Sequence, residues 1–308
     1  MDTQKRLLVE SIPEFPDELM IPEIDEETKL CLKKYLSYSE TLQNIHQLFE
    51  VYLFNLNQID DFCTMYYSDE IIRNYDGKEV GFIEINALLI NVISAGKTLI
   101  EGIEKFIKIE ISKERADKFK KEIISKKYDD VFSFRFLYYL RNFAQHGNLP
   151  VSKSLEGKFC FDLSQIMATL HIPTSPSIKQ SMEQVARDII EKYKSEPRID
   201  FTYTLDMYTL TVVELYYSFI KEIEEESYAH YNKIQEILIE TPELIIQEEG
   251  MKDMVVFELE DDCLHMFSSK DNFRKMYDHY KKEAKEKVKY FNRIHKNSRE
   301  LCDDVIKN

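Results

Sequence analysis

The residue types best suited to chemistry lie together in the segment 140–147, which reads Leu-Arg-Asn-Phe-Ala-Gln-His-Gly. The guanidinium of Arg141 offers a planar fork of N–H donors that matches the oxygens of a phosphate group. The imidazole of His146 can give and take a proton near neutral pH, and the amide of Asn142 adds a donor and an acceptor beside the arginine. Together these side chains could polarise a phosphate ester and move its protons, so we predict a catalytic site here.

The segment lies at the end of a predicted amphipathic helix over residues 129–146. Each residue of an α-helix turns by about 100°, which places five apolar residues on one stripe that should face a core: Phe132, Phe136, Tyr139, Leu140 and Phe143. Asn142 and His146 are four residues apart and should lie at the edge of this stripe, whereas Arg141 projects to the opposite side. This arrangement fits a cleft between two copies of the helix better than a site within one chain. Gly147 and Pro150 should end the helix.

The segment resembles the R-x4-6-H motif of the HEPN superfamily, in which a polar residue, often asparagine, follows the arginine. Here Asn142 follows Arg141, and His146 stands five residues after the arginine. The order of helices is also similar, because that family has a bundle of four main helices with the motif at the end of the third. The helices expected to correspond lie at about 37–66, 82–109, 129–146 and 204–240. The resemblance covers about half of the chain and implies a mostly α fold.

The resemblance implies a metal-independent endoribonuclease without a cofactor, acting as a homodimer with a composite site at one cleft. His146 would transfer protons to or from the RNA 2′-hydroxyl or the leaving oxygen, Arg141 would hold the scissile phosphate, and Asn142 would orient either group. RNA follows because the 2′-hydroxyl is the internal nucleophile, and the products should end in 2′,3′-cyclic phosphates. The family also implies a toxin or anti-phage defence setting, with a cognate antitoxin or defence-system protein as a candidate partner. Some members carry a tyrosine at the position of Asn148, so their control by nucleotidylation is not expected here.

Two other interpretations of the motif remain open. Arg141 and His146 could be a purely structural helix end, where a cationic side chain complements the helix dipole. The chain could also be a catalytically inactive HEPN-like module that binds a protein partner through its acidic arm and C-terminal region. A second arginine–histidine pair with the same spacing, Arg274 and His279, lacks the amide, the glycine and the preceding apolar stripe. We therefore treat this second pair as a chance match.

Basic residues gather at 105–127 and at 270–299. The first cluster directly precedes the motif helix, and we predict that it contacts RNA through Lys118, Lys121, Lys126 and Lys127. The alternative is a solvated helix face whose lysines pair with glutamates three or four residues away.

The composition limits the fold class, the mode of nucleic-acid binding and the cellular location. Only 7 glycines and 8 prolines among 308 residues favour long helices over a sandwich or barrel. The formal net charge of −15 excludes a general nucleic-acid binder, so RNA must be bound by local patches. Five scattered cysteines without a C-x-x-C motif, and an N-terminus without an apolar leader, favour a cytoplasmic protein. The most apolar run, 83–96, carries Glu84, Asn86 and Asn91, so no membrane span is expected.

We predict a mostly α protein with a small β element and a long C-terminal helix. Residues 1–35 should form an acidic, proline-punctuated arm, and 36–240 a HEPN-like bundle with an inserted segment at about 151–195. The insert should hold a short strand near 159–163 and a helix from Ser177 to Lys194. Residues 241–308 should form a β-hairpin, 244–246 with 254–259, followed by a basic helix. No metal site is expected, because Cys263 and His265 have no second ligand pair at a suitable spacing, and phosphate-binding glycine loops and serine-hydrolase motifs are absent from the sequence.

Overall fold

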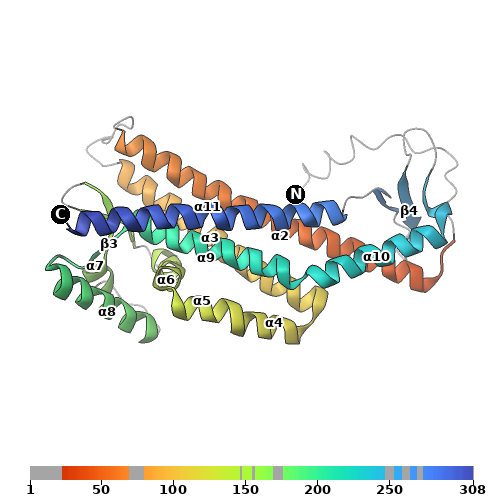
Figure 1. Ribbon diagram of the computed structural model, residues 1–308, viewed down its shortest axis with the longest axis horizontal. Helices are drawn as coiled ribbons and strands as arrows, with labels where there is room; N and C mark the ends of the chain where they lie inside the picture. The colour runs from red at the N-terminus through yellow and green to blue at the C-terminus, as the bar shows by residue number, and fades with distance from the viewer. Residues whose placement is uncertain are drawn as a thin grey trace. The chain divides into compact units, whose positions relative to one another are not determined.

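The computed structural model confirms the mostly α architecture with small antiparallel sheets and a long C-terminal helix (Figure 1). It describes residues 23–68, 80–145, 148–154, 157–168, 176–246, 253–258, 264–268 and 273–307. The α-helices are α2 (Glu26–Tyr67), α3 (Val80–Phe106), α4 (Lys113–Phe119), α5 (Ser125–Asp130), α6 (Phe132–Gln145), α7 (Leu163–Ala168), α8 (Pro176–Tyr193), α9 (Phe201–Glu222), α10 (Glu224–Glu240) and α11 (Phe273–Lys307). Two π-helical segments, η1 (Ile107–Ile111) and η2 (Lys120–Ile124), flank α4, and a short 3-10 turn, η3 (Pro242–Leu244), follows α10.

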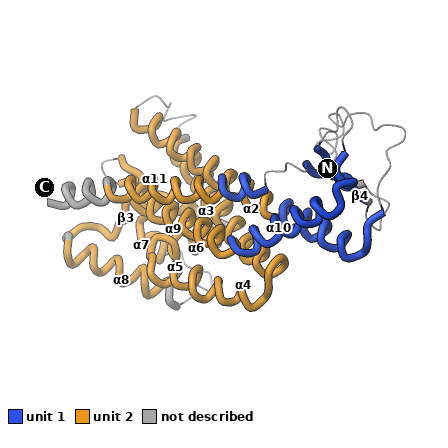
Figure 2. The backbone as a smooth tube through the Cα atoms, turned by 45° about the vertical axis from the view of Figure 1, so that its right-hand side comes forward, with its two compact units in different colours: residues 1–41, 224–279 blue, residues 42–223, 280–308 orange. Residues whose placement is uncertain are grey.

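The chain divides into two compact units, coloured separately in Figure 2. The smaller unit comprises residues 1–41 and 224–279, and the larger unit comprises 42–223 and 280–308. The expected division placed 36–240 in one bundle, whereas the observed boundary assigns 224–240 to the smaller unit. The predicted helix 204–240 is in fact two helices, α9 and α10, because Ile223 leaves the helical conformation with φ −97° and ψ 8°.

The core of the larger unit is built from aromatic side chains of α2, α3, α6 and α9. Phe49 of α2 stacks on Tyr216 of α9 with ring centroids 4.0 Å apart, and Phe134 of α6 stacks near Tyr208 of α9 at 5.8 Å. All four side chains are almost fully buried, and burial of such a ring contributes on the order of 2–3 kcal/mol. Helix α3 approaches closely at Gly96, where an added Cβ would lie only 2.5 Å from the hydroxyl oxygen of Tyr208.

Helix α2 begins about ten residues earlier than predicted, so residues 26–35 of the expected arm are helical. The carboxylate of Asp25 accepts the backbone N–H of Thr28 at 2.7 Å, which is the bond of a helix N-cap. This bond is the main cause of the lowered pKa of Asp25. Glu26 and Glu27 in the first turn complement the helix dipole. The rest of the predicted arm, residues 1–22, lies outside the described residues.

Two small antiparallel sheets complete the fold. Strand β2 (Phe159–Asp162) pairs with β1 (Ser152–Lys153) on one side and β3 (Arg198–Asp200) on the other. It confirms the strand predicted near 159–163, although Cys160 is buried like Phe159 and Phe161 and Leu163 begins α7. The second sheet joins β4 (Met254–Glu258) to β5 (Leu264–Ser268). The predicted hairpin partner of β4, residues 244–246, does reach it: Ile245 bridges Val255, and Ile246 donates its N–H to the carbonyl of Met254 and accepts the N–H of Asp253. This segment is not itself a strand, because Pro242–Leu244 form the turn η3. The strand that pairs with β4 along its length is β5.

One helical stretch, Gly81–Ile111, is long and apolar enough by composition to cross a membrane. Of its most apolar window, 44% is buried inside the protein. Its residues Ile85, Leu89 and Val92 are completely buried, as expected for a core helix. This helix is therefore compatible with a soluble protein.

Candidate functional site

Helix α6 carries the predicted site and has the predicted amphipathic form. It runs from Phe132 to Gln145, three residues shorter at its start than expected, because Tyr128–Asp130 belong to α5. Four residues of the apolar stripe are buried, with Phe136 and Leu140 at 0% exposure and Tyr139 and Phe143 below a tenth, whereas Phe132 is half-buried. The stripe fixes the rotation of α6 in the bundle, and with it the direction in which the motif residues leave the helix.

Arg141 lies in the last turn of α6 and is half-buried. Its Nε atom is buried, and its guanidinium makes no hydrogen bond or ion pair with any residue that the structure describes. A buried donor without an acceptor costs about 1–3 kcal/mol, so this side chain suits an acceptor that arrives from elsewhere. The sequence placed Arg141 on the side opposite the apolar stripe, and in the structure its side chain is partly buried at Nε. His146, Gly147 and the side chain of Asn142 lie outside the described residues.

The surroundings of Arg141 hold charges of both signs. Burial and the charges of Glu101 and Glu104 raise the pKa of Tyr138, which lies one turn before Arg141. The positive charge of Arg141 acts in the opposite direction and lowers this pKa. Lys97 of α3 places its Nζ 4.9 Å from the centroid of the same ring. Lys97 therefore lies over the ring of Tyr138, and Arg141 acts on the same tyrosine electrostatically.

Each of the two carboxylates near Tyr138 is matched by a lysine. The Nζ of Lys97 lies 3.7 Å from Glu101 Oε1, and the Nζ of Lys120 lies 2.7 Å from Glu104 Oε2. Because both carboxylates have a counter-charge, the charge of Arg141 is not cancelled by an ion pair among the described residues.

Asn86 of α3 anchors the chain beyond the motif, a role that sequence reasoning missed. Its Oδ1 accepts the backbone N–H of Val151 at 2.9 Å, and its Nδ2 donates to the carbonyl of Phe82 at 2.8 Å. Asn86 and Val151 both have 0% exposure. Closer to the motif, the amide of Asn148 donates to the carbonyl of Phe143 at 3.4 Å. Residues on both sides of His146 are therefore tied to the bundle. The available sequence signal was an amide inside the apolar run 83–96.

The predicted RNA-binding lysines differ in their surroundings. Lys118, Lys121 and Lys126 are exposed. Lys127 is about one third exposed, and its Nζ lies 2.5 Å from Glu214 Oε2 of α9, so it joins α5 to the bundle. Lys121 lies in the π-helical segment η2, a helix form that often marks functional sites.

The second arginine–histidine pair lies in a different setting. Arg274 and His279 are both exposed on the first turns of α11. The guanidinium of Arg274 lies over the ring of Tyr228, 5.4 Å from its centroid, instead of being buried without an acceptor. This pair thus differs from Arg141 in burial as well as in sequence context.

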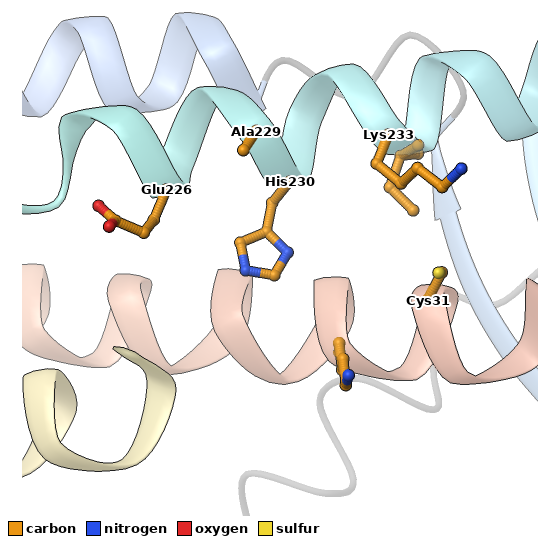
Figure 3. A pocket seen from close by; sticks show the side chains of 7 residues that line it. Cys31, Glu226, Ala229, His230 and Lys233 are labelled. Atoms are coloured by element: carbon orange, nitrogen blue, oxygen red, sulfur yellow. The ribbon is translucent and has the colours of Figure 1, made fainter. Parts of the chain in front are cut away.

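A cavity of about 260 Å³ lies in the smaller unit between α2 and α10 (Figure 3). His230 projects from α10 toward α2, and Cys31 projects from α2 toward α10 (Figure 3). The remaining lining residues are Lys34, Glu226, Ala229, Lys233 and Ile234. Burial, and then the charge of Lys34, lower the pKa of His230, which favours the neutral imidazole. The described residues hold no group of three or more metal-ligating side chains.

Comparison of the chain with protein-family models, curated proteins and solved structures gives no match. The resemblance to the HEPN superfamily therefore rests on the Arg141–His146 motif and on the order of the helices.

Proposed function

We propose that the chain is a metal-independent endoribonuclease that cleaves RNA by attack of the 2′-hydroxyl on the neighbouring phosphate. The observation that carries this proposal is the state of Arg141. Its guanidinium has no hydrogen-bond acceptor among the described residues, its Nε is buried, and it stands five residues before His146 at the end of an amphipathic helix. A phosphate would supply the missing acceptor through charge-assisted hydrogen bonds.

Each motif residue has one role in this reaction. His146 accepts the proton of the 2′-hydroxyl, whose oxygen forms a bond to phosphorus while the bond to the 5′-oxygen of the next nucleotide breaks. The imidazolium formed in this way gives its proton to the leaving 5′-oxygen. Arg141 binds the phosphate oxygens and stabilises the charge that develops on them. Asn142 orients the imidazole or a phosphate oxygen. The products end in a 2′,3′-cyclic phosphate and a 5′-hydroxyl.

The helix geometry favours a site shared between two copies of the chain. On the sequence-based expectation that the helix extends to His146, five residues turn through about 500°, so we expect Arg141 and His146 to project about 140° apart. One phosphate can meet both side chains more readily if they come from different protomers across a homodimer cleft. The family resemblance adds the setting, a cytoplasmic toxin or anti-phage defence system with a cognate antitoxin or defence-system protein as partner.

Cleavage of a mixed RNA pool in EDTA tests the proposal. We expect the wild-type protein to leave 2′,3′-cyclic phosphate ends, and His146→Ala to reduce the rate by about 100-fold or more. Arg141→Lys keeps the charge but loses the planar fork, and should reduce the rate by at least about tenfold. The matched control is His279→Ala, which removes the histidine of the second pair and should cleave like the wild type.

Three results would contradict the proposal. Equal cleavage by the wild type and His146→Ala would assign the activity to another site or to a contaminant. Loss of activity in EDTA alone would indicate a metal-dependent reaction. Absence of cleavage by a folded dimer would instead favour the catalytically inactive interaction module.

A further inference from the structure

The exposed face of α11 carries a row of cations that the catalytic proposal does not use. Between residues 282 and 296, eight side chains are exposed, of which five are basic and one, Glu286, is acidic. The basic ones are Lys282, Lys285, Lys289, Arg293 and Lys296. They recur every three or four residues, so they share one side of the helix over about 21 Å. Such a row stands out in a chain whose net charge is −15.

The opposite side of the same helix packs inside the larger unit. Ala284 and Phe291 are buried, the ring of Tyr280 stacks on His46 of α2 at 3.6 Å, and His295 lies 5.5 Å from the ring of Tyr203 of α9. The apolar side of α11 is thus occupied by its own unit, which leaves the basic side for a partner. A helix that inserts into a membrane surface would need that apolar side free.

Four of the cations have no counter-charge in the part of the chain that the structure describes. Lys282, Lys285, Lys289 and Arg293 form no hydrogen bond or ion pair with any residue in the described part of the chain. The cluster at 105–127 is mixed in this respect, because Lys120 and Lys127 are paired with glutamates, whereas Lys118, Lys121 and Lys126 form no such pair with a described residue. Holding unpaired cations in a row costs repulsion, which a polyanion would relieve by neutralising them and releasing its own counterions.

An exposed aromatic ring adjoins the row. Tyr290 is 56% exposed and precedes Arg293 by three residues, so it lies at the edge of the row beside that arginine; its ring is 5.1 Å from that of Phe291. An exposed ring beside cations can stack on an unpaired base, whose face a duplex does not offer. An acidic peptide offers no nucleobase to stack on this ring.

We propose that the face of α11 formed by Lys282, Lys285, Lys289, Tyr290 and Arg293 binds the phosphodiester chain of a single-stranded nucleic acid. Binding by this face requires no cleavage, so the inference goes beyond the proposed nuclease. The choice of RNA over DNA as the natural strand rests on the proposed function.

Fluorescence anisotropy with the full chain tests this inference. The probes are labelled oligomers of about 15 nucleotides and one mixed sequence, as single-stranded DNA and as 2′-O-methyl RNA. Neither has the free 2′-hydroxyl that the proposed cleavage needs. Failure of the nuclease and failure of this surface are therefore distinguishable. Preference for the RNA oligomer would identify RNA as the natural strand, and equal binding would identify the shared phosphate chain as the ligand.

The first variant replaces Lys282, Lys285 and Lys289 with glutamine. We expect about tenfold or more weaker binding at low salt, and a slope of log affinity against log salt that is smaller by about 2, since each phosphate contact of a single strand contributes about 0.7. The control replaces three exposed lysines elsewhere, Lys33, Lys179 and Lys194. It changes the net charge equally and should bind within twofold of the wild type.

The second variant tests the aromatic ring. Tyr290→Ala should weaken single-strand binding by about fivefold or more, whereas Tyr290→Phe should bind the single strand like the wild type. Both variants should bind a duplex of the same sequence as well as the wild type does. The inference is overturned if the wild type binds neither oligomer, or if the two triple variants weaken binding equally. It is also overturned if polyglutamate competes as well as the oligomers, since that result would indicate an acidic protein partner.

Discussion

The bond between Asn86 and Val151 predicts a loss of stability when the amide is removed. Asn86 lies on the core side of α3 and accepts the buried backbone N–H of Val151 at 2.9 Å. Asn86→Ala leaves that N–H without an acceptor in a region from which water is excluded. A buried donor left in this state costs about 1–3 kcal/mol.

A control with the same local helix bond isolates this cost. Asn292 of α11 is exposed, and its Nδ2 donates to the carbonyl of Val288 at 2.9 Å, as the Nδ2 of Asn86 donates to Phe82 at 2.8 Å. Both alanine variants lose this bond and both gain roughly 0.5 kcal/mol of helix propensity. The difference in free energy of unfolding between them is therefore the contribution of the Val151 bond and the burial, about 1–3 kcal/mol in favour of Asn292→Ala.

Urea unfolding of both variants measures this difference, and hydrogen exchange at the Val151 amide shows whether the named bond is responsible. We expect faster exchange at that amide in Asn86→Ala and unchanged exchange in Asn292→Ala. Two variants of equal stability, within about 0.5 kcal/mol, would refute the reasoning. Because Val151 stands five residues after His146, Asn86→Ala should also reduce RNA cleavage, whereas Asn292→Ala should not.

Three further predictions concern buried contacts and pH. The hydroxyls of Tyr38 and Ser227 lie 2.8 Å apart in the smaller unit, and a double-mutant cycle of Tyr38→Phe and Ser227→Ala should give a coupling free energy of about 1 kcal/mol, with a value near zero counting against the bond. Gly96→Ala places a Cβ 2.5 Å from the Tyr208 hydroxyl and should destabilise by about 1–3 kcal/mol in thermal unfolding, with Tyr208→Phe restoring part of the loss. His230 has a lowered pKa in the folded state, so the unfolded state binds more protons and stability should fall as pH drops below about 6.5. This fall should be smaller in His230→Phe than in the wild type. An equal fall in both proteins would contradict the prediction.

The long helices were predictable because their apolar residues recur at helical spacing over many turns. The stripe of α6, for example, includes Phe136, Leu140 and Phe143, and all three are buried. The alternation at 159–163 likewise indicated β2. In α3, α6 and β2 the local pattern and the packing agree, so the sequence alone placed these elements within a few residues.

The boundaries were less predictable because they depend on single residues without a distinctive signal. Asp25 starts α2 by capping Thr28, yet it lies in a run of acidic residues that resembles a disordered arm. Ile223 ends α9 without a glycine or proline, and it is completely buried, so tertiary packing sets the break. Asn86 is visible in the sequence as a polar residue in an apolar run. Its hydrogen-bond partner could not be predicted, because Val151 is 65 positions away.

The basic residues of the larger unit fall into two groups. Those with an acidic partner join helices and stabilise the fold, and those without one are the residues to which we assign ligand binding. Arg115 binds Glu222 through two nitrogen atoms at 3.0 and 2.9 Å, and Lys127 binds Glu214, so both join the α4–α5 region to α9. Arg141 and four cations of α11, Lys282, Lys285, Lys289 and Arg293, have no such acceptor among the described residues. Net charge alone would exclude a nucleic-acid ligand, because 56 acidic residues outnumber 41 basic ones. Affinity depends instead on the cations that remain unpaired, and these are the residues on which both proposals rest.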